Sequence, residues 1–169
     1  MRISAAVSRE GQPHPQFEVL DLEEPRVDEV RVSIAATGIC HSDLYCHSAR
    51  GVPVPRPIVL GHEGAGSVEA MGVDVRGLAV GDHVVLSGGS CGVCPSSRAA
   101  RPNYCREVMK LSFGGRRIDG SSPLSQNGER IAGAFFVQSW AACSAGKVLK
   151  PVLRMKLNGP NTLDWEHTT

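Results

Sequence analysis

Two short stretches of the chain carry residue types that bind metal ions. One reads G-I-C-H-S-D over residues 38–43, and the other reads L-G-H-E-G-A-G over residues 60–66. Cys40 can supply a thiolate and His62 an imidazole, ligands that suit Zn²⁺. The alternative is that both side chains fill a core, since free cysteine and histidine are often buried. The pair predicts a zinc site if the rest of the chain completes its ligand set.

A second cluster of cysteines comprises Cys91, Cys94 and Cys105. The C-x-x-C spacing after a Gly-Gly turn is typical of a zinc lobe, in which both sulfurs reach one ion. Such a site normally has four ligands, and Ser97 stands where another C-x-x step would place a cysteine. Because a neutral hydroxyl is a poor zinc ligand, the lobe is loose, three-coordinate or empty. The alternative is three reduced cysteines on a mobile lobe.

The elements that must position these residues are short strands. Residues 29–36 alternate polar and apolar side chains, which predicts a half-buried strand that ends at Gly38 and leaves Cys40 on the next loop. A short helical turn is expected after it, with Ser42 or Asp43 as its cap. Three prolines make residues 50–58 an extended loop. The other predicted strands are 3–7, 17–22, 64–71 and 82–87, a pattern that favours a small barrel or sandwich.

The second half of the chain gives weaker signals. Residues 106–132 are polar and glycine-rich and predict a long surface loop, in which Arg116 and Arg117 are solvated. Residues 134–140 are the last strand-like run. No periodicity is found in residues 141–169, which we expect to be a divergent, poorly ordered tail.

Composition excludes several classes of function. The 169 residues contain 18 basic and 17 acidic side chains, so no basic field is available for nucleic acid. No apolar run is long enough to span a membrane, and the N-terminus is too short in apolar residues for a secretory signal. C-x-x-C spacing without such a signal indicates metal or redox chemistry rather than disulfides. We therefore expect a cytoplasmic protein with reduced thiols.

Taken together, these motifs resemble the N-terminal catalytic domain of the zinc-dependent medium-chain alcohol dehydrogenases. The resemblance covers residues 1–140 and rests on A-A-T-G-I-C-H-S-D, P-I-V-L-G-H-E-G-A-G-S-V-E-A-M-G, G-D-H-V-V-L and the zinc lobe at residues 88–106. Residues 103–125 and F-F-V-Q-S are closest to the aryl-alcohol, or benzyl-alcohol, branch. The family implies a mainly β fold with short helices, a GroES-like partly open β-barrel, which a Rossmann domain follows.

The resemblance assigns roles to the residues around the first site. Cys40 and His62 would be two of three protein ligands of the catalytic zinc, with Glu63 close behind the metal. Asp43 would hydrogen-bond the His62 imidazole and fix its tautomer. The cysteines of the lobe would hold a structural zinc, which is incomplete because of Ser97.

The same resemblance implies NAD-linked oxidation of aryl primary alcohols to aldehydes. Zinc lowers the pKa of the alcohol, and the nicotinamide accepts the hydride. Ser42 would take the alcohol proton, and His41 would lie against the cofactor's pyrophosphate. Tyr45 stands where some relatives have the outer histidine of a proton relay, for which His47 is a weak substitute.

Two parts of such an enzyme are missing from these residues. No G-x-G-x-x-G fingerprint of a nicotinamide-binding domain is present, and Cys143 lies too early to be the usual third zinc ligand. We therefore expect a truncated enzyme that is inactive alone. The alternative is a non-catalytic GroES-like zinc-binding remnant or interaction module. The parent family is homo-oligomeric, and we predict weak solubility or self-association.

Overall fold

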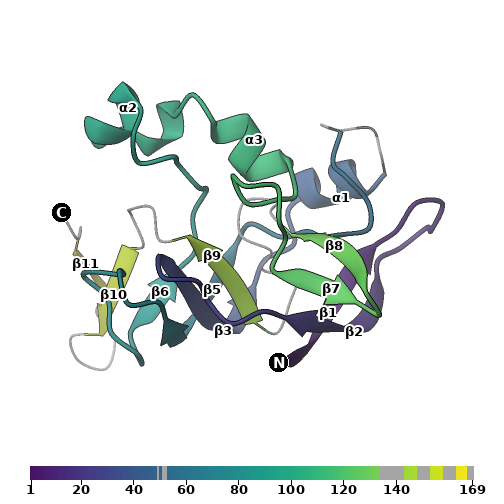
Figure 1. Cartoon of the computed structure of the whole chain (residues 1–169), viewed down its shortest axis with the longest axis horizontal. Coiled ribbons are helices and arrows are strands. Elements are labelled where there is room, and N and C mark those ends of the chain that lie inside the picture. Colours follow the sequence, from purple (N-terminus) through teal and green to yellow (C-terminus); the bar gives the residue numbers. More distant parts are fainter. Residues whose placement is uncertain (49, 51–52, 134–142, 148–152, 158–162, 167–169) are drawn as a thin grey trace.

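The computed structural model describes the chain except for residues 49, 51–52, 134–142, 148–152, 158–162 and 167–169 (Figure 1). The described part is mainly β with short helices, which confirms the predicted fold class. Its helices are α1 (His41–His47), α2 (Pro95–Arg98), α3 (Val108–Phe113) and the 3₁₀ turn η1 (Pro102–Tyr104). Its strands are β1 (Arg2–Ser8), β2 (Gln16–Leu22), β3 (Glu29–Thr37), β4 (Ile58–Val59), β5 (Gly64–Met71), β6 (His83–Val85), β7 (Leu124–Gln126), β8 (Glu129–Gly133), β9 (Cys143–Lys147), β10 (Leu153–Leu157) and β11 (Leu163–Glu166).

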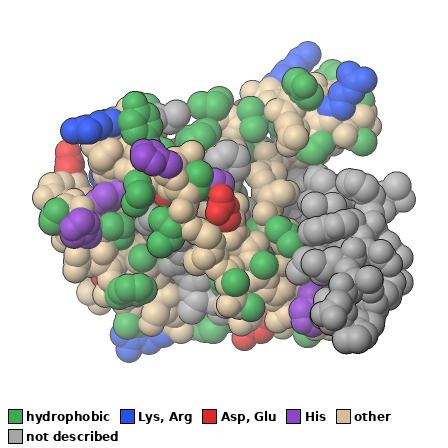
Figure 2. Space-filling model, turned by 180° about the vertical axis from the view of Figure 1, so that it is seen from behind, with side chains coloured by type: hydrophobic (Ala, Val, Ile, Leu, Met, Phe, Trp, Pro, Cys, Tyr) green, Lys and Arg blue, Asp and Glu red, His purple; other side chains and the backbone are tan. Residues whose placement is uncertain are grey.

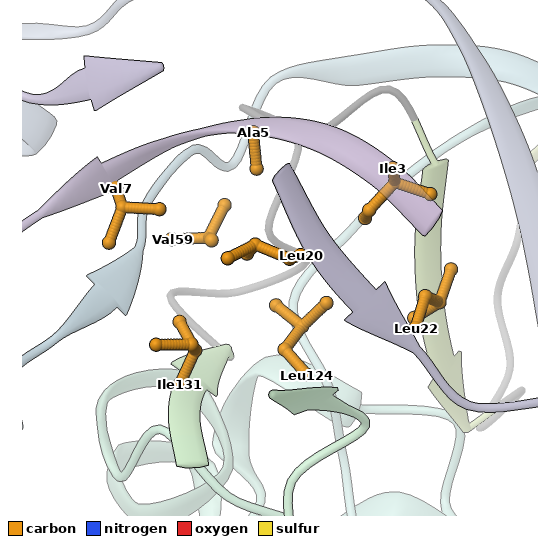
Figure 3. Close-up of a cluster of buried hydrophobic side chains, with 8 residues drawn as sticks. All are labelled: Ile3, Ala5, Val7, Leu20, Leu22, Val59, Leu124 and Ile131. Carbon is orange, nitrogen blue, oxygen red and sulfur yellow. The ribbon is translucent and has the colours of Figure 1, made fainter. Parts of the chain in front are cut away.

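Five strands form a barrel in the order β1-β2-β7-β8-β4. The barrel is closed, where the sequence predicted a partly open one, because β4 pairs with both β1 and β8. Alternate residues of β1 and β2 point inward and meet side chains from the other barrel strands (Figure 3). The resulting core consists of Ile3, Ala5, Val7, Leu20, Leu22, Val59, Leu124 and Ile131. Each large apolar side chain buried in this way contributes roughly 1.5–3 kcal/mol.

The second sheet has six strands in the order β11-β10-β6-β5-β3-β9. Its central pair is β3 with β5, whose register runs from Val30 opposite Met71 to Thr37 opposite Gly64. Valines from β3, β5 and β6 form the core of this sheet. The register brings the residues that follow β3 next to the residues that precede β5. Both predicted metal motifs therefore begin at the same end of one strand pair.

The prediction of a long surface loop over residues 106–132 is wrong. This segment contains α3 and the hairpin of β7 and β8, which completes the barrel. The two-residue turn is Asn127-Gly128, with φ values of 49° and 82°. Asn-Gly is the strongest short hairpin signal because both positions of a type I′ turn need positive φ. The polar composition of the segment hid this signal.

The same segment also contains a buried ion pair that the sequence analysis missed. Arg117 donates two hydrogen bonds to Glu29, at 2.6 and 2.8 Å, and a third to Glu23. Glu29 is buried, and Arg117 keeps only 12% of its side chain exposed. Burial alone would lower the pKa of Arg117, but the hydrogen bonds to the two carboxylates raise it above its usual value. Arg117 is therefore not the solvated loop residue that we predicted.

Three strands lie in the segment for which the sequence showed no periodicity. β9 pairs with β3, and β10 pairs with β6 and β11. The strand predicted over residues 134–140 lies outside the described residues, and the domain boundary at residue 140 stays a prediction.

No helix in the described part of the chain is both long and apolar enough to cross a membrane. On the face shown in Figure 2, the lysine and arginine side chains of the described residues lie at the periphery.

Candidate metal centres

The structure brings Cys40 and His62 together, and Glu63 with them. The Cys40 sulfur, an imidazole nitrogen and a carboxylate oxygen all lie within 4.8 Å of one another. Cys40 follows β3, and the other two residues come directly before β5. A hydrogen bond of 2.9 Å from the Gly38 amide to the Glu63 carbonyl extends the strand pairing into the site. Thiolate, imidazole and carboxylate are the three donor types that zinc accepts, so the cluster fits that ion.

Asp43 lies behind this cluster and holds two of its members. Its side chain is fully buried, and its Oδ1 lies 3.1 Å from Nδ1 of His62. Its Oδ2 accepts the backbone N–H of Cys40 at 3.0 Å. An ionised carboxylate only accepts hydrogen bonds, so we assign the imidazole proton to Nδ1. The lone pair of Nε2 is then available to a metal, as the predicted role of Asp43 requires.

Cys40 is also the N-cap residue of α1, a position that the sequence analysis gave to Ser42 or Asp43. Asp43 is instead the third residue of the helix, and it accepts the N–H of the capping residue. The carboxylate at this position is the returning half of a capping box. The cap prediction was therefore wrong by two to three residues. The local reason is that Cys40 already has extended backbone angles, φ −88° and ψ 155°.

Glu63 brings a carboxylate to the cluster. The resemblance predicted that this residue lies close behind the metal and that the third protein ligand is missing. Glu63 Oε1 lies 3.9 Å from Nε2 of His62, the ring nitrogen that carries no proton in this assignment. The carboxylate occupies space that exists because residue 38 is glycine: a Cβ on Gly38 would collide with Glu63 Oε2. Three donors from this chain thus surround one point. The predicted role of Glu63, close behind the metal, stays a prediction.

The other residues predicted for this site lie on α1. Ser42 is exposed, and its hydroxyl lies 3.6 Å from the Cys40 sulfur, beside the cluster. His41 is exposed at the start of the helix, where it is accessible to a ligand. Tyr45 is half exposed on the same helix. The structure thus places Ser42 next to the candidate metal ligands, and it leaves the roles of His41 and Tyr45 untested.

His47, the weak substitute for the relay histidine, is held elsewhere. Its Nδ1 lies 2.7 Å from the hydroxyl of buried Ser8 in β1. Arg56 donates to the same hydroxyl at 2.7 Å and to the carbonyls of Cys46 and His47 at 2.8 and 2.7 Å. This network has no sequence signal, because its members are far apart in the chain. It ties the end of α1 to the barrel.

The second centre is the lobe that carries α2 and η1 (Figure 1). Cys91, Cys94 and Cys105 are all buried, and their sulfurs lie within 4.8 Å of one another. Backbone N–H groups point at the sulfurs: Cys91 donates to the Cys105 sulfur at 3.2 Å, and Cys94 donates to the Cys91 sulfur at 3.3 Å. The cysteines whose side chains are described are free thiols. The three predicted lobe cysteines therefore form one compact group.

Hydrogen bonding in the lobe favours thiolates. The Ser97 hydroxyl, then the amides of Arg106 and Ser97, lower the pKa of Cys94 to about 6 against the opposing effect of burial. The amides of Val93 and Cys94 lower the pKa of Cys91 in the same way. A thiolate is the form of cysteine that binds metals. The donor set of the lobe thus fits a soft or borderline cation.

Comparison with known proteins defines the family. Residues 26–149 match the family described as the alcohol dehydrogenase GroES-like domain. A closed small barrel with a thiol, imidazole and carboxylate cluster at the end of a strand pair is consistent with that match. The chain belongs to this family, the zinc-dependent medium-chain alcohol dehydrogenases, as its sequence motifs indicated.

Individual relatives agree with this assignment. The chain is 46% identical over 136 residues to geraniol dehydrogenase of Castellaniella defragrans, a match that covers 80% of this chain and 36% of that protein. A crystal structure of an alcohol dehydrogenase zinc-binding domain protein from Burkholderia ambifaria superposes with a TM-score of 0.88 at 40% identity. Benzyl alcohol dehydrogenase from Acinetobacter calcoaceticus gives 0.84 at 36% identity. These two matches cover 95% of this chain and 43% and 42% of the solved chains. The chain thus spans about a third of the length of its curated relative.

Proposed function

We propose that the chain is the zinc-binding domain of an NAD-linked dehydrogenase that oxidises primary alcohols with an aromatic or allylic carbon next to the hydroxyl carbon. The observation that carries the proposal is the cluster of Cys40, His62 and Glu63 with Asp43 behind the imidazole. The substrate class is supported by the relatives named for geraniol and benzyl alcohol, which are allylic and benzylic primary alcohols.

In this proposal, Cys40, His62 and Glu63 hold a zinc ion. Bound zinc supplies Lewis-acid chemistry that lowers the pKa of an alcohol. Asp43 keeps the His62 proton on Nδ1, which would leave the Nε2 lone pair available to the ion. The exposed Ser42 hydroxyl accepts the alcohol proton beside Cys40 and passes it to solvent.

A nicotinamide cofactor must also be held against the reacting carbon, and its hydride acceptance is the second half of the reaction. His41, exposed beside the cluster, is the residue of this chain that we assign to the cofactor's pyrophosphate. The 169 residues contain no G-x-G-x-x-G fingerprint for binding the dinucleotide. We therefore propose that the chain binds zinc but does not turn over alcohol by itself.

Purification followed by elemental analysis and an NAD- or NADP-linked assay with benzyl alcohol and geraniol tests both statements. We expect bound zinc, a loss of the catalytic-site ion in His62→Ala, and no turnover. His14→Ala is the matched control, because this histidine is exposed and lies outside the cluster. Protein without zinc would overturn the ligand assignment. Turnover of alcohol by the isolated chain would refute the proposal that it is inactive alone.

The alternative is a non-catalytic zinc-binding module, in which the same cluster binds zinc without recognising an alcohol. The two functions differ in whether the zinc site recognises alcohols. In the proposed function, benzyl alcohol shifts the His62 ring signals of the zinc-loaded chain in NMR spectra. Unchanged His62 signals at saturating benzyl alcohol would support the non-catalytic module instead.

A further inference from the structure

The position of Ser97 determines what the cysteine lobe can bind. Its hydroxyl oxygen lies 3.2 Å from the Cys94 sulfur and 3.8 Å from the Cys91 sulfur. Its backbone N–H also points at Cys94, at 3.5 Å. Ser97 therefore stands at the corner of the cluster that a fourth cysteine would occupy, at the C-x-x spacing seen between Cys91 and Cys94.

Ser97 does not complete a zinc site at this corner. Serine has one hydroxyl proton, and a nearby thiolate is its acceptor. A hydroxyl that donates to the Cys94 sulfur is neutral, and neutral alcohols are far weaker zinc ligands than thiolate, imidazole or carboxylate. The fully protein-ligated, four-coordinate zinc that the family implies does not fit the lobe of this chain.

The three sulfurs are nevertheless arranged to bind a cation. All three cysteines are buried, and each sulfur accepts at least one backbone N–H: from Cys94 to Cys91, from Ser97 to Cys94, and from Cys91 and Glu107 to Cys105. Such donors stabilise thiolates without occupying the coordination positions themselves. A cation bound here has three protein ligands, the number that catalytic zinc sites have when one position is left to a solvent ligand.

The fourth corner is accessible from solution. Ser97 itself is partly exposed, in contrast to the buried cysteines. An open hollow of about 450 Å³ lies on the same lobe, lined by Ser96, Arg101 and Tyr104. Two of these residues directly precede Ser97 and Cys105 in the chain. A small molecule therefore has room at the surface of the lobe.

We propose that Cys91, Cys94 and Cys105 form an open three-thiolate centre, which binds a divalent zinc-like cation and leaves its fourth position to an exchangeable ligand, a small thiol from solution. Binding of the cation releases to solvent those protons that the three cysteines still carry as thiols. When the small thiol enters, it loses its proton to solvent and displaces water from the cation. No redox step is involved. The inference does not depend on the proposed alcohol chemistry.

The test uses Co²⁺ as a coloured substitute for zinc in the full chain, with His62→Ala to weaken the other site. Three proteins are compared: the chain with Ser97, Ser97→Cys and Ser97→Ala. Each is titrated with 2-mercaptoethanol. With Ser97 kept, and equally in Ser97→Ala, we expect sulfur-to-cobalt absorption bands that shift saturably with added thiol. In Ser97→Cys the site is closed, so the bands should not shift, and cobalt affinity should rise at least tenfold.

Three results would overturn the proposal. One is a lobe that binds no cobalt unless Ser97 is replaced by cysteine. Another is a set of cobalt bands that ignore added thiol while Ser97 is present. The last is loss of cobalt in Ser97→Ala, since this would make the hydroxyl a ligand. If Ser97→Cys does not fold, the response of the other two proteins to added thiol still decides.

Discussion

At the scale of single residues, Asp43 holds two candidate metal ligands in place. Its two oxygens bind the His62 imidazole and the Cys40 backbone N–H. In Asp43→Asn, the amide oxygen keeps the Cys40 hydrogen bond and the amide nitrogen turns toward His62. The imidazole then accepts at Nδ1 and carries its proton on Nε2, which blocks metal binding. We expect zinc affinity to fall about 10- to 100-fold.

A zinc titration followed by the His62 ring signals in NMR spectra measures this change and reports the tautomer directly. Asp82→Asn is the control, because it removes the same charge from a turn where Asp82 accepts the Ala79 N–H at 2.9 Å. Equal zinc affinity of the wild type and Asp43→Asn would show that Asp43 serves only the helix cap.

Gly38 is the second residue on which the site depends. A methyl group there would collide with the Glu63 carboxylate and push it out of the cluster. We therefore expect Gly38→Ala to weaken zinc binding about as much as Glu63→Gln, with little further loss in the double variant. Gly89→Ala is the matched control, since its methyl group would meet only Leu111 at an ordinary 3.7 Å. Additive losses in the double variant would contradict this coupling.

At the scale of elements, Arg117 joins the segment after α3 to the start of β3. Its removal leaves the buried Glu29 carboxylate without its charged partner, although the Arg26 amide still donates to it at 3.1 Å. We expect Arg117→Ala to lower the free energy of unfolding by about 3 kcal/mol, the usual cost of breaking a buried pair. The neighbouring, exposed Arg116 provides the control, and Arg116→Ala should change stability by less than about 0.5 kcal/mol. Urea unfolding measures the free energy of unfolding of both variants. Similar decreases in the two variants would show that Arg117 is solvated like Arg116.

These elements show what sequence patterns could and could not predict. Alternation and glycine turns located β3 and β5 almost to the residue. The nearness of Cys40 and His62 was predicted from their residue types and the family motif, and the pairing of β3 with β5 explains it. The pairing of Arg117 with Glu29 was invisible because 88 residues separate the partners. The resemblance predicted Glu63 near the metal, but the dependence of its carboxylate on the absence of a side chain at Gly38 has no sequence signal. The Asn127-Gly128 turn was readable, but the polar composition around it was given more weight.

At the scale of the whole molecule, the candidate catalytic site lies between two sheets. Cys40 and the His62-Glu63 pair extend from the six-stranded sheet, through β3 and β5. The far end of α1 is fixed to the barrel by Arg56 and Ser8. The helix that carries Asp43 therefore has one end on each sheet. Metal binding and the relative placement of the sheets are coupled through this helix, so zinc should stabilise the entire fold.

The same region exposes apolar surface. Ile39, Leu44 and Tyr45 keep 69%, 49% and 50% of their surface exposed beside the candidate site. Because exposed apolar groups clustered near a site promote association, we expect the chain to self-associate as its concentration rises. The double variant Ile39→Ser/Leu44→Ser should shift the equilibrium toward monomer. Val73→Ser/Val80→Ser is the control, which removes apolar side chains that are at least as exposed (78% and 62%) from another surface segment. Sizing chromatography with light scattering measures the mass, and a wild-type chain that stays monomeric at high concentration would refute the expectation.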